Sequence, residues 1–454
     1  MLHYFEVFTT QREYKMNIRI SVPRSHVHSE YRKFDFFFLI AHKLFLYLFR
    51  LLCQLKVVLI LYPLLRHIPE KFYPKLLYPI EYEIISSSTR VIFTRSKHNN
   101  QQICLKLWQL QNQNICNEKL VTRNIHYLLE GFEFNHRFAP DVYLGVAPVI
   151  LNNNNNSILR GQLIEKPEKS KLHLNAEYAL MMRRLEEEHR LDSHLKHNRW
   201  NIATRAGMEF LASEVAAMHT QLNNSPDDMR KSYRISSKLN INIELFHEAL
   251  NHSPKRDQYV EKYQYIADTI LQACKNYAHY FEERCIGNHI KRCHGDLKTT
   301  NLWIYPKKSY CWGLMQSTPK LVALDCVDFN PDFCHIDTLS DVAMLAIDLE
   351  MHLSGNLDGS INTSCEQEFS EYFLNTYLQL IQENSKSARP LLEYYMTEKA
   401  MVCAYVSILY DKLPDDGEKY LNIAFNHAQR LKNMQEQLVP LYQNSEFLFS
   451  STSA

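Results

Sequence analysis

The sequence predicts an α+β fold in which a small part rich in β-strands precedes a larger, mainly helical part. Residues 82–85, 91–95 and 102–108 cluster β-favouring side chains between polar turns, which indicates three antiparallel strands. Beyond residue 186, apolar side chains recur at helical spacing. We expect helices over 209–222, 259–285, 340 onward, 369–384, 391–409 and 418–438.

Residues 291–301 read Lys-Arg-Cys-His-Gly-Asp-Leu-Lys-Thr-Thr-Asn, which places Asp296 and Asn301 at opposite ends of one short loop. A further carboxylate, Asp325, ends the next apolar run. Strands at 301–305 and 320–325 can pair as a hairpin through a loop at 306–319, which brings Asn301 and Asp325 together. Phosphoryl transfer needs a carboxylate to accept a hydroxyl proton, and an amide and a carboxylate to hold Mg²⁺. The pattern therefore predicts a phosphotransfer site.

This loop resembles the catalytic loop of the aminoglycoside phosphotransferase and choline kinase group. It is most similar to a bacterial aminoglycoside-phosphotransferase-like branch that carries His-Gly-Asp-Leu-x-x-x-Asn and then a Phe-Asp-Cys-Ile-Glu-Phe-Asn-like run. Here residues 324–330 read Leu-Asp-Cys-Val-Asp-Phe-Asn. The resemblance implies a two-lobed, protein-kinase-like fold that uses ATP and Mg²⁺. By the same resemblance Asp296 is the catalytic base, Asn301 and Asp325 bind metal, and His294 and Asp341 support the loop.

The resemblance also implies a nucleotide site in the small lobe. Lys106, on the predicted strand 102–108, is similar in position to the kinase lysine that contacts the α- and β-phosphates. A glutamate of the helix at 117–138 is expected to pair with Lys106; Glu130 aligns better, and Glu133 stays an alternative. The first hairpin has no glycine, so Ser87 and Ser88 are expected to offer hydroxyl and backbone N–H groups to the phosphates.

These motifs divide the chain into four parts. We expect a basic, apolar extension at 1–77, a small lobe at 78–185, a large lobe at 186–441 that contains the catalytic loop, and a polar tail at 442–454. The stretch 34–65 is densely apolar but interrupted by charges, which favours an amphipathic helix on a membrane surface or packing on the kinase body over a membrane span.

Composition narrows the class of protein further. Lys and Arg total 51 against 50 Asp and Glu, and there is no basic block of the kind that binds nucleic acid. The 11 cysteines are scattered without regular spacing, which favours reduced thiols and a cytoplasmic location. Residues 321–385 hold twelve Asp and Glu but no Lys or Arg, which favours a neutral or cationic acceptor.

The sequence leaves several functions open. The first is a phosphotransferase that moves the γ-phosphate of ATP to a hydroxyl of a small molecule. The second is a catalytically silent kinase-like scaffold, although a silent protein has no need to keep Lys106, Asp296, Asn301 and Asp325 together. A protein kinase is disfavoured because the loop reads His-Gly-Asp and no Asp-Phe-Gly or Ala-Pro-Glu follows. Adenylyl transfer on the same fold also stays open.

We predict that deletion of residues 1–65 leaves ATP binding intact, because the kinase-like pattern begins only near residue 78. Calorimetric ATP affinity and liposome flotation of the truncated and full-length chains test this. Loss of ATP binding in a truncated protein that is still well folded would contradict the prediction.

Overall fold

The structure is a computed structural model that describes residues 75–85, 89–96, 102–108, 118–152, 157–172, 177–197, 199–231, 235–253, 255–311, 314–328, 330–353 and 363–449. All of these residues belong to one compact unit, Pro74–Ala454. The apolar stretch 34–65 and the predicted phosphate contacts Ser87 and Ser88 lie outside the described residues.

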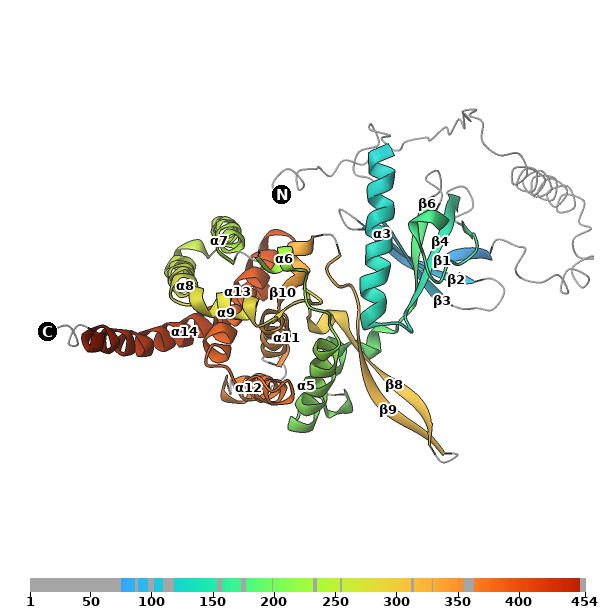
Figure 1. Ribbon diagram of the computed structural model, residues 1–454. Coiled ribbons are helices and arrows are strands. Elements are labelled where there is room, and N and C mark those ends of the chain that lie inside the picture. The colour runs from blue at the N-terminus through green and yellow to red at the C-terminus, as the bar shows by residue number, and fades with distance from the viewer. Residues whose placement is uncertain are drawn as a thin grey trace, which may run out of the picture. The chain divides into compact units, whose positions relative to one another are not determined.

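The first part of this unit is a closed antiparallel barrel in the strand order β1-β2-β3-β6-β4-β5. Its strands are β1 (Lys75–Ile85), β2 (Thr89–Ser96), β3 (Gln102–Trp108), β4 (Tyr143–Asn152), β5 (Ser157–Arg160) and β6 (Glu177–Arg183). Barrel closure pairs β1 with β5, which leaves neither strand as an open edge. Helix α3 (Glu118–Phe138) runs beside the strands (Figure 1).

The second part is largely helical, so the predicted α+β class is confirmed. The α-helices are α4 (Leu191–Lys196), α5 (Arg205–Thr220), α6 (Asp227–Lys231), α7 (Ile235–His252), α8 (Arg256–Asn276), α9 (Ala278–Ile286), α10 (Pro331–Cys334), α11 (Thr338–Leu353), α12 (Thr363–Leu380), α13 (Ala388–Leu409) and α14 (Pro414–Phe449). The remaining strands are β7 (Ile290–Arg292), β8 (Leu302–Cys311), β9 (Leu314–Ala323) and β10 (His335–Asp337). Short 3₁₀ turns occur at Lys169–Lys171, Glu187–His189, Arg199–Asn201 and Thr299–Asn301.

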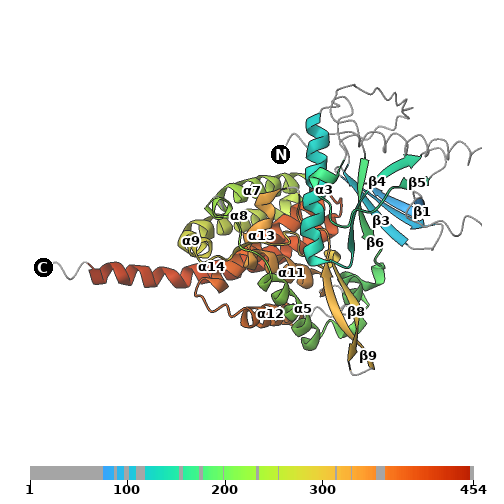
Figure 2. The ribbon, with the colours of Figure 1, turned by 45° about the vertical axis from the view of Figure 1, so that its right-hand side comes forward.

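Helix α11 lies at the centre of the helical part, with α12, α13 and α14 around it (Figure 2). All of its residues from Thr338 to Met351 are buried, including the acidic side chains Asp341, Asp348 and Glu350. A buried carboxylate is costly unless donors satisfy it, so each of these three side chains must have partners on neighbouring elements.

The hairpin of β8 and β9 joins the two parts because its alternate residues enter different cores. Leu302 and Ile304 pair with Ala323 and Leu321 across the hairpin, and all four belong to the core of the helical part. The intervening pair, Trp303 and Val322, packs with residues of β4, β6 and α3. Opposite strand faces thus bind to opposite lobes, as the period of two requires.

Three elements differ from the sequence predictions. The segment 306–319, expected as a loop, is mostly strand, because β8 and β9 pair as far as Cys311 and Leu314. The helix predicted over 259–285 is divided at Tyr277 into α8 and α9. Helix α14 continues to Phe449, through most of the segment that we expected as a polar tail. Of the helices in the described ranges, none is long and apolar enough to cross a membrane.

A buried histidine connects three of the helices. His427 of α14 is fully buried, and its two ring nitrogens lie 2.7 Å from Glu393 Oε2 of α13 and 3.2 Å from Glu350 Oε2 of α11. Burial by itself would lower the pKa of His427, but the two glutamates outweigh it and raise the pKa to about 9. The imidazolium between two carboxylates therefore stabilises the contact of α14 with α11 and α13.

We predict that part of the stability depends on the charge of His427. A folded-state pKa of about 9 against about 6.5 in the unfolded chain gives a contribution of about 3 kcal/mol. Because the folded pKa is the higher one, this contribution is fully present below pH 6.5 and is lost as the pH rises through 9. Urea denaturation at pH 6 and pH 9.5 should show that loss in the native chain but not in His427→Gln. The exposed helix histidine His252, changed to Gln, is the control; equal pH dependence in all three proteins would refute the assignment.

Candidate phosphotransfer site

The loop predicted to be catalytic, residues 293–301, begins where β7 ends, and we keep the name catalytic loop for it. Strand β7 is held by antiparallel pairing with β10. Gly295 adopts a φ of +83°, and a Cβ atom at this position would lie 2.6 Å from the carbonyl oxygen of Phe333. Glycine is therefore required by both conformation and space. The turn it makes directs the chain toward Asp296.

Asp296, Lys298 and Asn301 converge within this loop. Asn301 Nδ2 donates to both the backbone oxygen and the Oδ2 of Asp296, each at 2.9 Å. Lys298 Nζ lies 3.1 Å from the same Oδ2, and the attraction of Asp296 outweighs burial and raises the pKa of Lys298. One carboxylate oxygen is thus contacted by both an amide and a cation, which fixes the orientation of the Asp296 side chain. The sequence analysis did not single out Lys298, although it lies two residues after Asp296.

Asp341 supports the start of the loop from α11. Its Oδ2 accepts the N–H of His294 at 3.0 Å, and its Oδ1 accepts the N–H of Gly295 at 2.9 Å. His219 Nε2 lies 3.2 Å from Asp341, and its Nδ1 lies 2.6 Å from the hydroxyl of Tyr377. Burial raises the pKa of Asp341, but the bond and the charge of His219 outweigh it and lower that pKa, so the carboxylate is ionised at neutral pH.

His294 connects the loop to the segment that carries Asp325. The ring is fully buried, and its Nε2 lies 2.9 Å from the carbonyl oxygen of Leu324. Burial lowers its pKa, so the imidazole is neutral near pH 7. A carbonyl oxygen can only accept a hydrogen bond, so the proton of the neutral ring lies on Nε2. Nδ1 is then free to accept the N–H of Asp296, 3.4 Å away.

Asp325 follows β9 with a φ of 61°, a left-handed conformation that is uncommon outside glycine. Its N–H donates to the hydroxyl of Tyr143 at 3.0 Å, and the next N–H, of Cys326, donates to Asn135 Oδ1 at 2.9 Å. Tyr143 lies on β4 and Asn135 on α3, so elements of the first part hold this conformation. Strained backbone of this kind is frequent at functional sites.

Lys106 of β3 forms an ion pair with Asp325. The side chain of Lys106 is 13% exposed and that of Asp325 is 62% exposed, so the pair lies at the edge of the buried region. The charge of Lys106 is the main cause that lowers the pKa of Asp325. Burial would lower the pKa of Lys106, but Asp325 outweighs it and raises that pKa, which keeps both groups charged.

The two candidate glutamates of α3 have different surroundings. Glu133 is exposed and bonds Arg137 of its own helix at 2.7 Å. Glu130 is half-buried, and its charge acts on Arg292 and Cys334. Its pairing with Lys106 stays a prediction, as do the phosphate contacts of Ser87 and Ser88.

Asp328 is a further site residue that the sequence analysis did not single out. Its side chain is buried, and its Oδ2 has no hydrogen-bond partner among the described residues. Burial raises the pKa of Asp328 to about 6, although Lys106 lowers it. A signal was present in the sequence, because Asp328 follows Asp325 by three residues within the run 324–330.

These side chains fit a hard divalent cation. Mg²⁺ prefers oxygen ligands, and the site offers the carboxylates of Asp325 and Asp328 together with the amide of Asn301. The buried Oδ2 of Asp328 lacks a partner that a cation would supply. Two segments of the helical part, the loop that ends at Asn301 and the run after β9, would thus hold Mg²⁺ near Lys106.

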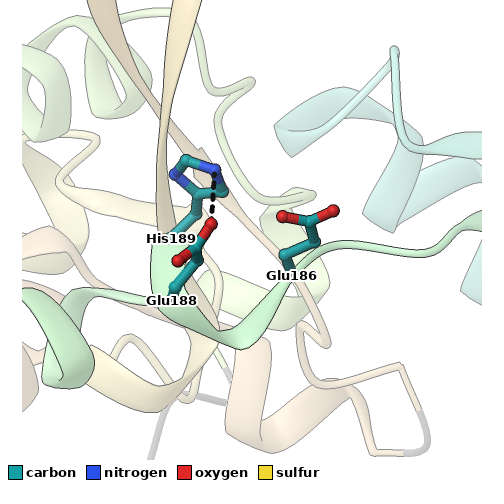
Figure 3. A group of neighbouring side chains, drawn as sticks. All are labelled: Glu186, Glu188 and His189. Atoms are coloured by element: carbon teal, nitrogen blue, oxygen red, sulfur yellow. Dashed lines mark ion pairs between the residues drawn. The ribbon is translucent and has the colours of Figure 1, made fainter.

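One other group has metal-binding residue types in suitable proximity within the described ranges. Glu186, Glu188 and His189, between β6 and α4, have ligand atoms within 4.8 Å of one another (Figure 3). Both glutamates are exposed, and Glu188 already lies 3.4 Å from Arg199 and 3.9 Å from His189. Glu188 is thus already paired with Arg199, and exposed acidic groups of this kind are common without a metal ion.

Comparisons with known proteins show similarity in structure but not in sequence. No family model and no curated protein matches the chain. The structure is similar to that of an ethanolamine kinase from Plasmodium vivax, with a TM-score of 0.41, 10% identity, and coverage of 77% of this chain and 82% of that one. For a choline kinase from Cryptosporidium parvum the TM-score is 0.37 and the identity 11%, with coverage of 83% of this chain and 92% of that one. For a glucosamine kinase the TM-score is 0.38 and the identity 11%, with coverage of 80% of this chain and 95% of that one. Likeness of this degree says nothing about what the chain binds.

We predict that the two bonds to the Asp325 segment differ in their contribution to stability. Asn135→Ala leaves the buried N–H of Cys326 without a partner, which should cost about 1–3 kcal/mol. Tyr143→Phe removes the acceptor of the Asp325 N–H. Because Asp325 is exposed whereas Cys326 is buried, a small shift of the backbone can turn this N–H toward water, so the cost should stay below about 1 kcal/mol. Urea denaturation of both variants measures this difference. A larger loss in Tyr143→Phe would show that Asp325 is more enclosed than the structure indicates.

Proposed function

We propose that the chain is an ATP- and Mg²⁺-dependent phosphotransferase whose acceptor is a hydroxyl group of a small molecule. One observation carries the proposal. Lys106 of the barrel pairs with Asp325, 219 positions away in sequence. The segment of Asp325 lies beside the loop in which Asn301 bonds Asp296, because the N–H of Leu324 donates to the carbonyl oxygen of Asn301 at 2.8 Å. Phosphoryl transfer depends chiefly on positioning and on charge stabilisation, and these groups supply both.

Asp296 is proposed to accept the proton of the attacking hydroxyl. Its Oδ2 is oriented by Asn301 and Lys298, which holds the carboxylate in place before an acceptor arrives. An ionised carboxylate within hydrogen-bond distance of a hydroxyl is a competent general base. Lys298 also places a positive charge beside the position where charge develops during transfer.

Asn301 is proposed to serve two purposes at once. An amide has one carbonyl acceptor and an N–H₂ donor, so Nδ2 can orient Asp296 while Oδ1 binds Mg²⁺. With Asp325 and Asp328, this oxygen would complete the protein's share of the metal site. Bound Mg²⁺ would neutralise charge on the phosphates. Lys106, now paired with Asp325, would turn to the α- and β-phosphates when nucleotide binds.

Many of the acidic side chains that suggested the charge of the acceptor have partners inside the protein. The acidic bias of 321–385 favoured a neutral or cationic acceptor, but many of these carboxylates are used inside the protein. Asp337 and Glu383 bond Arg284, Asp341 and Asp348 bond the catalytic loop, and Glu350 bonds His427. A buried, paired carboxylate adds little to the field outside the molecule.

We predict that Asp325→Asn weakens Mg²⁺-dependent nucleotide binding more than Asp296→Asn does, because Asp325 would hold the metal and Asp296 would act on the hydroxyl. Calorimetry with a non-hydrolysable ATP analogue, with and without Mg²⁺, measures both. The exposed Asp332 of the same acidic segment, changed to Asn, should bind like the native chain. Equal losses in Asp325→Asn and Asp296→Asn would mean that these roles are wrong.

Turnover tests the reaction itself. ADP formation should be measured across sugars, aminocyclitols, amino alcohols and peptides, and Asp296→Ala should lower the rate with the best acceptor by about 10²–10⁴. Release of pyrophosphate instead of ADP would indicate adenylyl transfer, and turnover only with peptides would indicate a protein kinase. Nucleotide binding without any turnover would favour the silent scaffold.

A further inference from the structure

A second buried aspartate of α11 contacts the far end of the catalytic loop. Asp348 lies seven residues after Asp341, which on an α-helix corresponds to two turns, the same face and a separation of about 10 Å. Its Oδ2 accepts both the N–H and the hydroxyl of Thr299, each at 2.6 Å. Thr299 is fully buried and begins the 3₁₀ turn that ends at Asn301.

The two aspartates therefore hold the loop on both sides of Asp296. Asp341 binds the N–H groups of His294 and Gly295, and Asp348 binds Thr299. Only Asp296, Leu297 and Lys298 lie between these two anchors, so their positions are set by a single rigid helix. Asn301 lies within the turn that Thr299 begins, so the orientation of its amide toward Asp296 depends on the same anchor.

Asp348 is held in turn by the C-terminal helix. The hydroxyl of Tyr420, on α14, donates to Asp348 Oδ1 at 2.5 Å. The side chains of Tyr420 and Asp348 are both buried, so the carboxylate has three donors: two from the loop and one from α14. Burial and the neighbouring carboxylate both raise the pKa of Tyr420, which keeps its hydroxyl protonated as a donor.

We propose that Asp348 is a positioning residue that sets the geometry of Asp296 and Asn301 through Thr299, with Tyr420 fixing the orientation of its carboxylate. This inference rests on the proposed phosphotransfer, and it assigns a function to a residue outside the expected catalytic set. A side chain that only stabilises the fold would change the population of folded protein. A positioning residue also changes the rate of the folded protein, because misplacement of reacting groups by about 1 Å can cost on the order of 10²-fold.

Three variants separate these possibilities. Asp348→Asn keeps the size of the side chain but gives it one acceptor oxygen for three donors. Tyr420→Phe removes only the support from α14. Glu350→Gln is the matched control, because Glu350 is a buried carboxylate of the same helix that bonds His427 and not the loop.

The measurements are the thermal midpoint, Mg·ATP turnover with KM and kcat, and hydrogen–deuterium exchange of peptides that cover 294–301. For Asp348→Asn we expect loop exchange at least tenfold faster and kcat at least tenfold lower, with KM for ATP within about threefold. Tyr420→Phe should show the same effects at smaller amplitude. Glu350→Gln should lower the thermal midpoint while loop exchange and kcat stay within about twofold of the native chain.

A conservative rescue adds a second criterion. Thr299→Val removes the hydroxyl donor and should lower kcat. Thr299→Ser keeps the hydroxyl, so its kcat should stay close to that of the native chain. If Asp348 acts through Thr299, the effects of Thr299→Val and Asp348→Asn will not add in the double variant.

Failure of this inference is distinguishable from failure of the proposed function. If Asp348→Asn changes neither loop exchange nor kcat more than Glu350→Gln does, the positioning role is overturned while phosphotransfer stands. If the native chain shows no turnover of Mg·ATP, the proposed function fails, and loop exchange alone decides whether Asp348 holds the loop. Fast loop exchange in Glu350→Gln as well would reduce Asp348 to one contributor to general stability.

Discussion

Buried carboxylates on α11 accept hydrogen bonds from N–H groups of the catalytic loop, and the candidate site depends on these bonds. Asp341 and Asp348 would be costly inside the helical core without donors. The loop backbone, as it turns at Gly295 and Thr299, would leave N–H groups without acceptors. The hydrogen bonds between them remove the cost of burying the carboxylates and the cost of burying the N–H groups. Both costs are removed only when the loop and the helix keep this relative position. This explains how a short, irregular segment can hold Asp296 in one position.

The barrel and the helical part meet through polar contacts as well as through packing. Asn135 of α3 and Tyr143 of β4 accept from consecutive N–H groups of Cys326 and Asp325, and Lys106 of β3 pairs with the Asp325 carboxylate. All of these contacts converge on one short segment after β9. A displacement of the barrel would therefore move Asp325, the residue proposed to hold the metal.

Much of this arrangement could be predicted from sequence, for identifiable reasons. The α+β class followed from the change in apolar periodicity. The position of Asn301 beside the segment that carries Asp325 followed from the pairing of two β-rich runs. Asp328 and Lys298 were missed because one carboxylate or lysine near a motif has no distinctive pattern; only burial and proximity mark them. Asp348 was hidden for another reason. An acidic residue in an apolar helix has meaning only once its partner, Thr299, is known from the fold.

The hairpin of β8 and β9 also restricts how this chain can diverge in evolution. Leu302 and Ile304 face one core while Trp303 faces the other, so inserting a single residue at the base would exchange the two sets. Insertions of two residues would preserve the facing of every side chain beyond them. Length changes among divergent homologues should therefore occur in even numbers near the base of the hairpin and be unrestricted toward its turn. Because the two faces of the hairpin pack in different cores, related sequences should differ near its base by even numbers of inserted or deleted residues.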